Sequence, residues 1–183
     1  MLYLFLADGF EEVEAIAPVD LLRRAEISVQ TVGVTGKNVT GSHGVTVTAD
    51  ILPEQMEKAE TDGVILPGGM PGTLNLQKSE AVTEMLHYCA ENKKLIAAIC
   101  AAPMVLGEMG ILNGKKAVCF PGFEEHLEGA VLTDEPVQRD GNIITARGAG
   151  VAWQLGAAIV DYFCDGTSRE GKGEKLLSQI QMP

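Results

Sequence analysis

Short apolar runs alternate along the chain with longer segments in which apolar residues recur every three or four positions. The apolar runs are residues 2–7, 27–34, 64–66, 95–99, 116–120 and 142–146. The helical segments are residues 10–25, 79–92, 101–109, 151–163 and 174–181. Strands that alternate with helices at this spacing predict a mostly parallel sheet with helices on both faces. We therefore expect one α/β sandwich domain over residues 1–183.

Two shorter patterns add detail to this prediction. Residues 45–49 (V-T-V-T-A) indicate an antiparallel or edge strand, and residues 136–138 and 142–146 flank the Asp140-Gly141 turn of a predicted hairpin. Pro18 has no N–H to donate, so the helix over residues 10–25 should bend or restart there.

Composition and charge narrow the classes of function. The chain has 25 acidic and 14 basic residues and a net charge of −11. A nucleic-acid groove or an anionic membrane surface needs a concentrated positive field, so neither is expected as a partner. No apolar run approaches the roughly 20 residues that span a bilayer. The first residues, M-L-Y-L-F-L-A-D, lack the basic leader of a signal peptide and predict a strand instead.

The four cysteines form no C-x-x-C pair and are too few for a disulfide scaffold. We therefore expect reduced thiols and a cytoplasmic protein. Cys89 and Cys164 lie in helical segments and are interpreted as packing residues, whereas Cys119, near a predicted strand end, is left as a possible pocket-lining thiol.

Several polar or glycine-rich stretches follow predicted strands. They are residues 8–14, 68–72, Cys100, 120–121 and 147–150. In an open parallel sheet, ligands bind beyond the carboxyl ends of the strands. These stretches are therefore expected to converge on one crevice.

Cys100 is the leading candidate for a catalytic residue. It stands between the apolar run 95–99 and the helical segment that follows, at a predicted strand-to-helix elbow. The N–H groups that open the helix, Ala101 among them, and the helix dipole favour an anion, so the thiol is expected to ionise more easily than in water. The alternative is a buried structural cysteine.

Glu14 is the second candidate. It is in helical register with Ala17 and Leu21, so its carboxyl should lean toward the apolar face, where desolvation raises its pKa. A protonated carboxyl there could donate a hydrogen bond to a thiolate. The alternative is an edge position from which the carboxylate reaches water.

Two glycine-containing stretches could bind anions. Gly68-Gly69 could present backbone N–H groups to an oxyanion, and Arg147-Gly148-Ala149-Gly150 could form an anion site at a helix N-terminus. Each could equally be a tight turn. His43, His87 and His126 have no metal-ligand spacing, and no metal site is predicted.

Four motifs together resemble a known family. They are D-G-F-E-E-V-E at 8–14, L-P-G-G-M-P-G at 66–72, A-A-I-C-A-A-P at 97–103 and A-R-G-A-G at 146–150. Their order and spacing are similar to the ThiJ/PfpI superfamily, in the branch of the parkinsonism-associated protein deglycase and its bacterial homologues. The resemblance implies a flavodoxin-like three-layer sandwich that forms a homodimer.

The resemblance also implies roles for individual residues. Cys100 matches the reactive, oxidisable cysteine and Glu14 the protonated glutamate that hydrogen-bonds it. Gly68 and Gly69 match a glycine pair whose N–H groups face the thiolate and, with Ala101, would bind the oxyanion or substrate.

The remaining implied positions are peripheral to the nucleophile. Arg24 and His43 fall where that branch has dimer-interface residues. Independently of the resemblance, Phe120, Pro121, Arg147 and Gly148 follow predicted strand ends and are therefore expected to line the pocket.

Two positions depart from the family's pattern. Protease-like members have histidine directly after the cysteine, where this chain has Ala101, so peptidase activity is not expected. The deglycase branch often has histidine where this chain has Phe120. Glu14 is thus left as the acid–base group.

Two function hypotheses follow. In the first, the protein is a stress-response enzyme of glyoxalase or deglycase type (hydro-lyase or hydrolase chemistry), in which Cys100 attacks a small aldehyde or glycated substrate and Glu14 moves the proton, with no cofactor. In the second, it is a redox sensor or chaperone-like protein whose Cys100 is oxidised to sulfinate without turnover. Flavin binding is a third reading that rests on fold alone.

Overall fold

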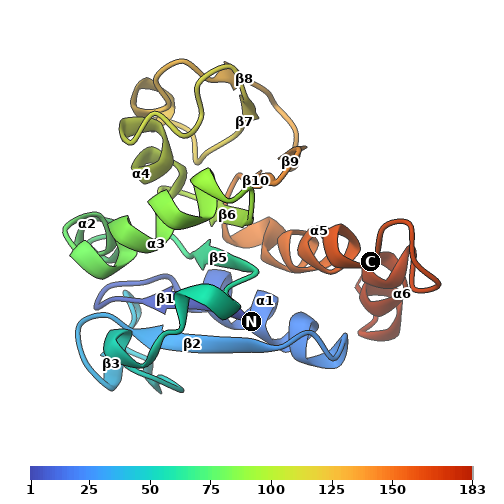
Figure 1. The fold of residues 1–183 in the computed structure, drawn as a ribbon, viewed down its shortest axis with the longest axis horizontal. Helices are drawn as coiled ribbons and strands as arrows, with labels where there is room; N and C mark the ends of the chain where they lie inside the picture. The colour runs from blue at the N-terminus through green and yellow to red at the C-terminus, as the bar shows by residue number, and fades with distance from the viewer. Residues whose placement is uncertain (183) are drawn as a thin grey trace.

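A computed structural model describes residues 1–182. Its helices and strands in chain order are β1 (Leu2–Leu6), α1 (Glu12–Arg24), β2 (Val29–Gly33), β3 (Asn38–Thr40), β4 (Thr46–Thr48), β5 (Gly63–Leu66), α2 (Gly72–Gln77), α3 (Glu80–Glu91), β6 (Leu95–Ile99), α4 (Pro103–Glu108), β7 (Lys116–Ala117), β8 (Val131–Leu132), β9 (Val137–Asp140), β10 (Ile143–Ala146), α5 (Ala152–Cys164) and α6 (Lys172–Gln179). Figure 1 shows their arrangement.

The central sheet has six strands in the order β2-β1-β5-β6-β10-β9. All neighbours are parallel except β9, which pairs antiparallel with β10 across the turn at Asp140 and Gly141. The first five strands have the order of a flavodoxin-like sheet. The α/β fold with a mostly parallel sheet is therefore confirmed, as is the hairpin.

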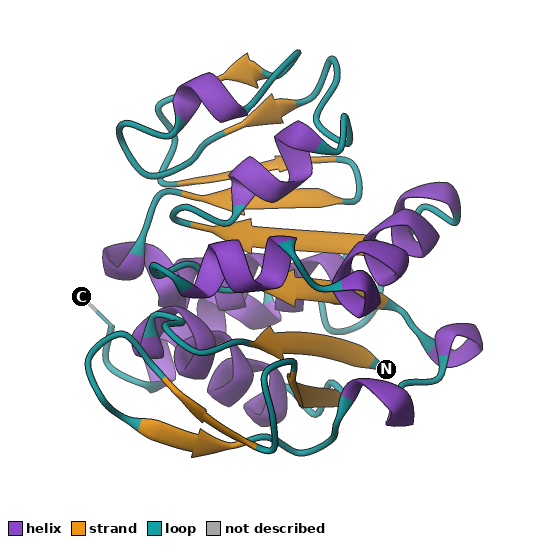
Figure 2. Cartoon of the chain, turned by 90° about the vertical axis from the view of Figure 1, so that its left-hand side faces the viewer, coloured by secondary structure: helices purple, strands orange, loops and turns teal. Residues whose placement is uncertain are grey.

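Helices cover both faces of the sheet (Figure 2). Along β1, Leu2, Leu4 and Leu6 pack into one core with α1, α5 and α6, whereas Tyr3 and Phe5 pack into a second core with α3 and α4. Successive side chains of a strand point to opposite faces, which is why a continuous apolar run fills both cores. No helix among residues 1–182 is long and apolar enough to cross a bilayer.

The small β3–β4 hairpin contains the predicted strand at residues 45–49, which pairs antiparallel as Thr46–Thr48. The structure differs from the sequence-based expectation at two other places. Residues 116–120 form no strand of the main sheet, because only Lys116 and Ala117 are extended and they pair with β8 in a separate two-stranded sheet. The helix over residues 10–25 begins at Glu12 and contains Pro18 without restarting there; the bend that was the other expectation stays a prediction.

Candidate active site

Cys100 lies in the turn between β6 and α4, with a φ of +63°. A left-handed conformation is costly for a residue with a Cβ and persists only where neighbours hold it. Two backbone hydrogen bonds do so: the Cys100 N–H donates to the Ala146 carbonyl at 2.9 Å, and the Phe120 N–H donates to the Cys100 carbonyl at 2.8 Å. The predicted elbow is confirmed, and its cysteine is half-buried.

Glu14 extends from the first turn of α1 into this turn, and the residue is only 1% exposed. Its Oε2 accepts a hydrogen bond of 2.9 Å from the Gly68 N–H, while Oε1 has no hydrogen-bond partner among residues 1–182. Burial, and then the charge of Glu11, raises the pKa of Glu14 to about 7. The inward orientation and the raised pKa expected from helical register are both confirmed.

The environment of Cys100 contradicts the expectation of an easily ionised thiol. Burial, and then the Glu14 carboxylate, raises the pKa of Cys100 to about 12. The backbone N–H groups of Ala101 and Gly69 act in the opposite direction but are outweighed. The sequence revealed the helix-opening donors, whereas the burial and the opposing carboxylate arise from the tertiary fold.

Glu14 and Cys100 each shift the pKa of the other, so they titrate as a pair. Loss of the first proton leaves one negative charge and one proton shared between them. The charge can then lie on the carboxylate beside a thiol, or on the sulfur beside a protonated carboxyl. In both arrangements Glu14 can accept or return the proton that Cys100 releases.

The backbone N–H groups of Gly68 and Gly69 act on different side chains. The Gly68 N–H donates to Glu14, so the expectation that it faces the sulfur was wrong. A Cβ on Gly68 would lie 2.6 Å from both Cys100 Cβ and Glu14 Oε2, so this position needs glycine for close approach. Gly69 has a φ of +90°, and its N–H is one of the two that lower the pKa of Cys100.

The four predicted pocket residues lie together. Phe120, Pro121, Arg147 and Gly148 line a cavity of about 390 Å³ that continues along the backbone to residue 151. Phe120 is 46% exposed and brings no acid–base group to the site. Gly148 also lies near the carboxyl of Glu14, since a Cβ placed on it would be 4.0 Å from Oε1.

The other cysteines are buried. Cys89 and Cys164 belong to the two cores, in agreement with a packing role. Cys119 lines a second cavity, of about 420 Å³, as its position near a strand end suggested. Burial, and then the charge of Glu124, raises the pKa of Cys119 to about 11, so it is not an activated thiol.

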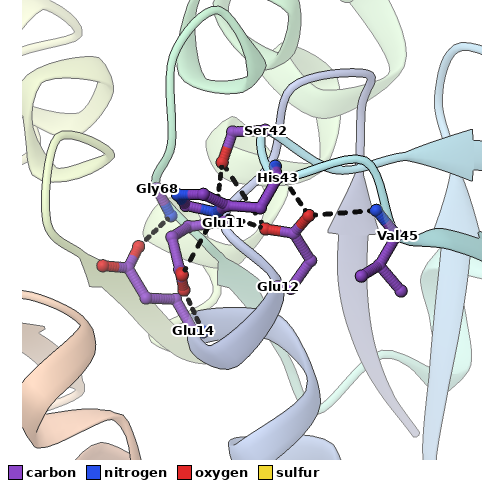
Figure 3. A network of polar contacts seen from close by, with 7 residues as sticks. All are labelled: Glu11, Glu12, Glu14, Ser42, His43, Val45 and Gly68. Carbon is purple, nitrogen blue, oxygen red and sulfur yellow. Dashed lines mark hydrogen bonds and ion pairs between the residues drawn. The ribbon is translucent and has the colours of Figure 1, made fainter.

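A polar network beside the site was not predicted (Figure 3). The Glu12 carboxylate accepts hydrogen bonds from the N–H groups of His43 at 2.8 Å and Val45 at 3.3 Å, and pairs with His43 Nδ1 at 2.9 Å. Although burial raises it, the pKa of Glu12 falls to about 2 because of these bonds. The network anchors the β3–β4 hairpin to the start of α1.

Glu11, Glu12 and His43 also place their ligand atoms within 4.8 Å of one another, close enough to hold a metal ion. The hydrogen bonds already account for this arrangement, because Glu12 anchors the hairpin and Glu11 Oε2 caps α1 by accepting from the Glu14 N–H at 2.7 Å. We therefore interpret the cluster as structural. Sequence spacing missed it because the hairpin, and not the local chain, brings His43 to α1.

Arg24 and His43, expected at a dimer interface, both have exposed side chains. Arg24 pairs with Asp20 one turn earlier at 2.7 Å, and the His43 side chain is 71% exposed. Their role at an interface stays a prediction.

The DJ-1/PfpI family model matches residues 1–162, most of the chain. The chain belongs to the DJ-1/PfpI family. Among relatives, it is 37% identical over 183 residues to the Parkinson disease protein 7 homolog of Danio rerio, covering 97% of this chain and 93% of that protein. It is 40% identical over 161 residues to protein DJ-1 homolog B of Arabidopsis thaliana, covering 86% of this chain but spanning only 36% of that longer protein.

Two further relatives, one compared by sequence and one by structure, agree with this family assignment. A deglycase of Thermococcus kodakarensis is 32% identical over 153 residues, covering 80% of this chain and 90% of the relative. The crystal structure of Drosophila melanogaster DJ-1beta superposes with a TM-score of 0.91 at 32% identity, covering 100% of this chain and 97% of the other. The family resemblance inferred from the four motifs is thus confirmed.

Proposed function

We propose that the protein converts reactive 2-oxoaldehydes, or their adducts on amines, into 2-hydroxycarboxylates without a cofactor. Cys100 is the nucleophile and Glu14 the acid–base group. The observation that carries the proposal is the buried Glu14 carboxyl, whose Oε1 has no hydrogen-bond partner within residues 1–182, beside a half-buried thiol in a left-handed turn. The similarity to a protein named deglycase supports the same chemistry.

In the proposed mechanism, the Cys100 sulfur bonds to the aldehyde carbon while its proton passes through Glu14 to the carbonyl oxygen. Glu14 then removes the proton on that carbon and returns one to the neighbouring carbon, which converts the hemithioacetal into a thioester of the 2-hydroxy acid. Water hydrolyses the thioester and frees the thiol. The sum is 2-oxoaldehyde plus water giving 2-hydroxycarboxylate plus one proton. With an amine adduct, the C–N bond breaks as the C–S bond forms, and the free amine is released as a further product. A pKa near 7 suits a group that both accepts and donates protons at neutral pH.

Lactate formation from methylglyoxal tests this proposal. The wild type should form lactate, whereas Cys100→Ala should not exceed the rate without protein. Cys164→Ala serves as the matched control, because it removes a buried thiol in the core and should retain turnover. Equal lactate formation by wild type and Cys100→Ala would show that the proposed nucleophile is wrong.

One observation favours the alternative function of a redox sensor. Cys100 is half-buried whereas the other three cysteines are buried, so an oxidant reaches it first. Under limiting peroxide, mass spectrometry should find sulfinate at Cys100 before any change at Cys89, Cys119 or Cys164. Uniform oxidation of all four would exclude this function.

We also propose that the protein forms a homodimer through the exposed side of α1. Val13 is 47% exposed and Ile16 is 41% exposed, and with Trp153 they line an apolar hollow. Exposed apolar clusters of this kind are typical of protein–protein contacts.

A cytoplasmic location remains part of the proposal, supported by four free cysteines.

A further inference from the structure

A cavity of about 390 Å³ lies beside the turn that contains Cys100. Two parts of its lining are held to that turn through the backbone. Phe120 donates to the Cys100 carbonyl, and Ala146, the residue before Arg147, accepts the hydrogen bond from the Cys100 N–H. The cavity therefore keeps a fixed position relative to the nucleophile, and its volume is within the range of small-molecule sites.

The lining of this cavity, formed by residues 120–121 and 147–151, is almost wholly apolar. The guanidinium of Arg147 is engaged elsewhere, because it donates to the Asp134 carbonyl and pairs with the Asp134 carboxylate, and both residues line the neighbouring cavity. A charged ligand group would find little polar surface here, whereas an apolar group gains free energy by leaving water. The cavity is therefore suited to an apolar group of a ligand.

Phe120 is the largest apolar side chain of this lining. It is 46% exposed, and its ring packs against Gly148, because a Cβ placed on that glycine would lie 3.2 Å from Phe120 Cδ2. A ring held in this way and still open to solvent can take a second aromatic ring in an offset-stacked or edge-to-face arrangement. The cavity thus favours an aromatic group over a small aliphatic one.

Gly148 also connects this ring to the Glu14 carboxyl. The Cβ position that lies 3.2 Å from Phe120 Cδ2 is 4.0 Å from Glu14 Oε1, the oxygen without a hydrogen-bond partner within residues 1–182. Gly148 has a φ of 167°, an extended conformation that any residue adopts, so its missing side chain leaves space and is not needed for a turn. The ring edge and the carboxyl oxygen therefore lie against the same side of Gly148.

We propose that this cavity holds the apolar substituent of the substrate, and that the protein prefers aromatic 2-oxoaldehydes such as phenylglyoxal to methylglyoxal. The inference rests on the proposed function: in that reaction Glu14 returns a proton to the carbon that carries the substituent, so the substituent lies beside Glu14. Phenylglyoxal plus water then gives mandelate plus one proton. Phe120 is the residue that determines the preference, through contact with the ring of the substrate.

Initial rates of mandelate formation from phenylglyoxal and of lactate formation from methylglyoxal test the preference. The wild-type kcat/KM should be at least about tenfold higher for phenylglyoxal, and in Phe120→Ala the ratio of the two values should fall about tenfold. Comparing ratios between proteins cancels the intrinsic reactivities of the two aldehydes. Val131→Ala is the matched control: it shortens an apolar side chain that is 53% exposed outside the cavity, and it should keep the wild-type ratio.

An unchanged ratio in Phe120→Ala would overturn the proposal. A second measurement requires no turnover, because mandelamide and lactamide are neutral analogues of the two products. In an NMR titration of Cys100→Ser, mandelamide should bind at least about tenfold more tightly than lactamide and should shift the backbone amide signals of Phe120 and Gly148. Equal binding of the two amides, or shifts confined to other regions, would contradict the subsite.

The two measurements also separate this proposal from the proposed function. Selective mandelamide binding without turnover of either aldehyde would leave the subsite standing and remove the proposed function. Turnover of methylglyoxal without any preference for phenylglyoxal would do the reverse.

Discussion

Replacement of Glu14 by glutamine should slow alkylation of Cys100 at neutral pH. In the wild type, the first proton leaves the Glu14–Cys100 pair near pH 7, because burial raises the pKa of Glu14 to about 7. A thiolate beside a protonated carboxyl and a thiol beside a carboxylate base contain the same number of protons. Both arrangements therefore predict that Cys100 becomes reactive with a midpoint near pH 7.

The expected decrease in the alkylation rate follows from the loss of the ionisable carboxyl of Glu14. Glutamine cannot ionise, so Cys100 must lose its own proton, and burial, the first cause of its raised pKa, remains. The midpoint should then lie at or above the value of about 8.5 of a free cysteine. At pH 7 at most about 3% of the thiol would be ionised, whereas about half of the wild-type pairs have lost one proton and hold a Glu14 carboxylate that can take the proton from Cys100. If these pairs react as a thiolate does, alkylation should fall about 15-fold in Glu14→Gln.

Iodoacetamide labelling over a pH series, read by peptide mass spectrometry, gives the midpoint for each cysteine in one sample. Cys89, whose pKa burial raises to about 12, serves as the internal control and should stay unlabelled in the folded protein. Glu91→Gln, at the exposed end of α3, should reproduce the wild-type curve. A midpoint in Glu14→Gln that equals the wild-type value or falls below it would refute the coupling of the two groups.

Three further predictions concern stability, packing and assembly. The folded pKa of Glu14 is raised from 4.5 to about 7, so its contribution to stability is full below pH 4.5 and is lost as pH rises through 7. In a Cys100→Ser background, urea unfolding should show the free energy of unfolding of Glu14→Gln rising by on the order of 3 kcal/mol relative to that of Glu14 between pH 4.5 and 8. Parallel pH curves for the two proteins would contradict this prediction. Gly68→Ala should abolish methylglyoxal turnover and lower the free energy of unfolding by about 1–3 kcal/mol, because the added Cβ would lie 2.6 Å from Glu14 Oε2. A fully active variant would disprove this contact. Ile16→Arg should give a monomer by light scattering while changing unfolding by less than about 0.5 kcal/mol, and an unchanged mass would place the interface elsewhere.

Long elements with strong periodicity were predictable from the sequence. The parallel strands are buried on both faces, so β1 and β6 appear as continuous apolar runs, which are typical of a sheet covered on both sides. Short elements were not predictable: α2 has six residues and β7 two, too few for a period to appear. Residues 116–120 have strand-like composition, but tertiary pairing with β8 decides where they lie.

The features of the active site that depend on neighbouring residues in the sequence were predictable. Helical register indicated that Glu14 points inward, and the apolar run before Cys100 indicated an elbow. What these groups bond to is a property of the fold. The Gly68 N–H that the family pattern assigned to the sulfur instead donates to Glu14, because the loop after β5 lies against the start of α1, where the Glu11 N–H donates to the Gly68 carbonyl. Likewise His43 reaches Glu12 only because the β3–β4 hairpin folds back.

The pKa of Cys100 shows most clearly why a local motif is insufficient. The elbow supplies N–H groups that stabilise a thiolate, and this part can be inferred from residues 97–103 alone. The same turn is half-buried and faces a carboxyl, and these two influences have the opposite sign and are larger. The thiol taken by itself is therefore unreactive at neutral pH, and its reactivity depends on a second group that can take the proton. A strand-to-helix cysteine without an inward carboxyl should behave as an ordinary buried thiol, which is the behaviour that Glu14→Gln is expected to reveal.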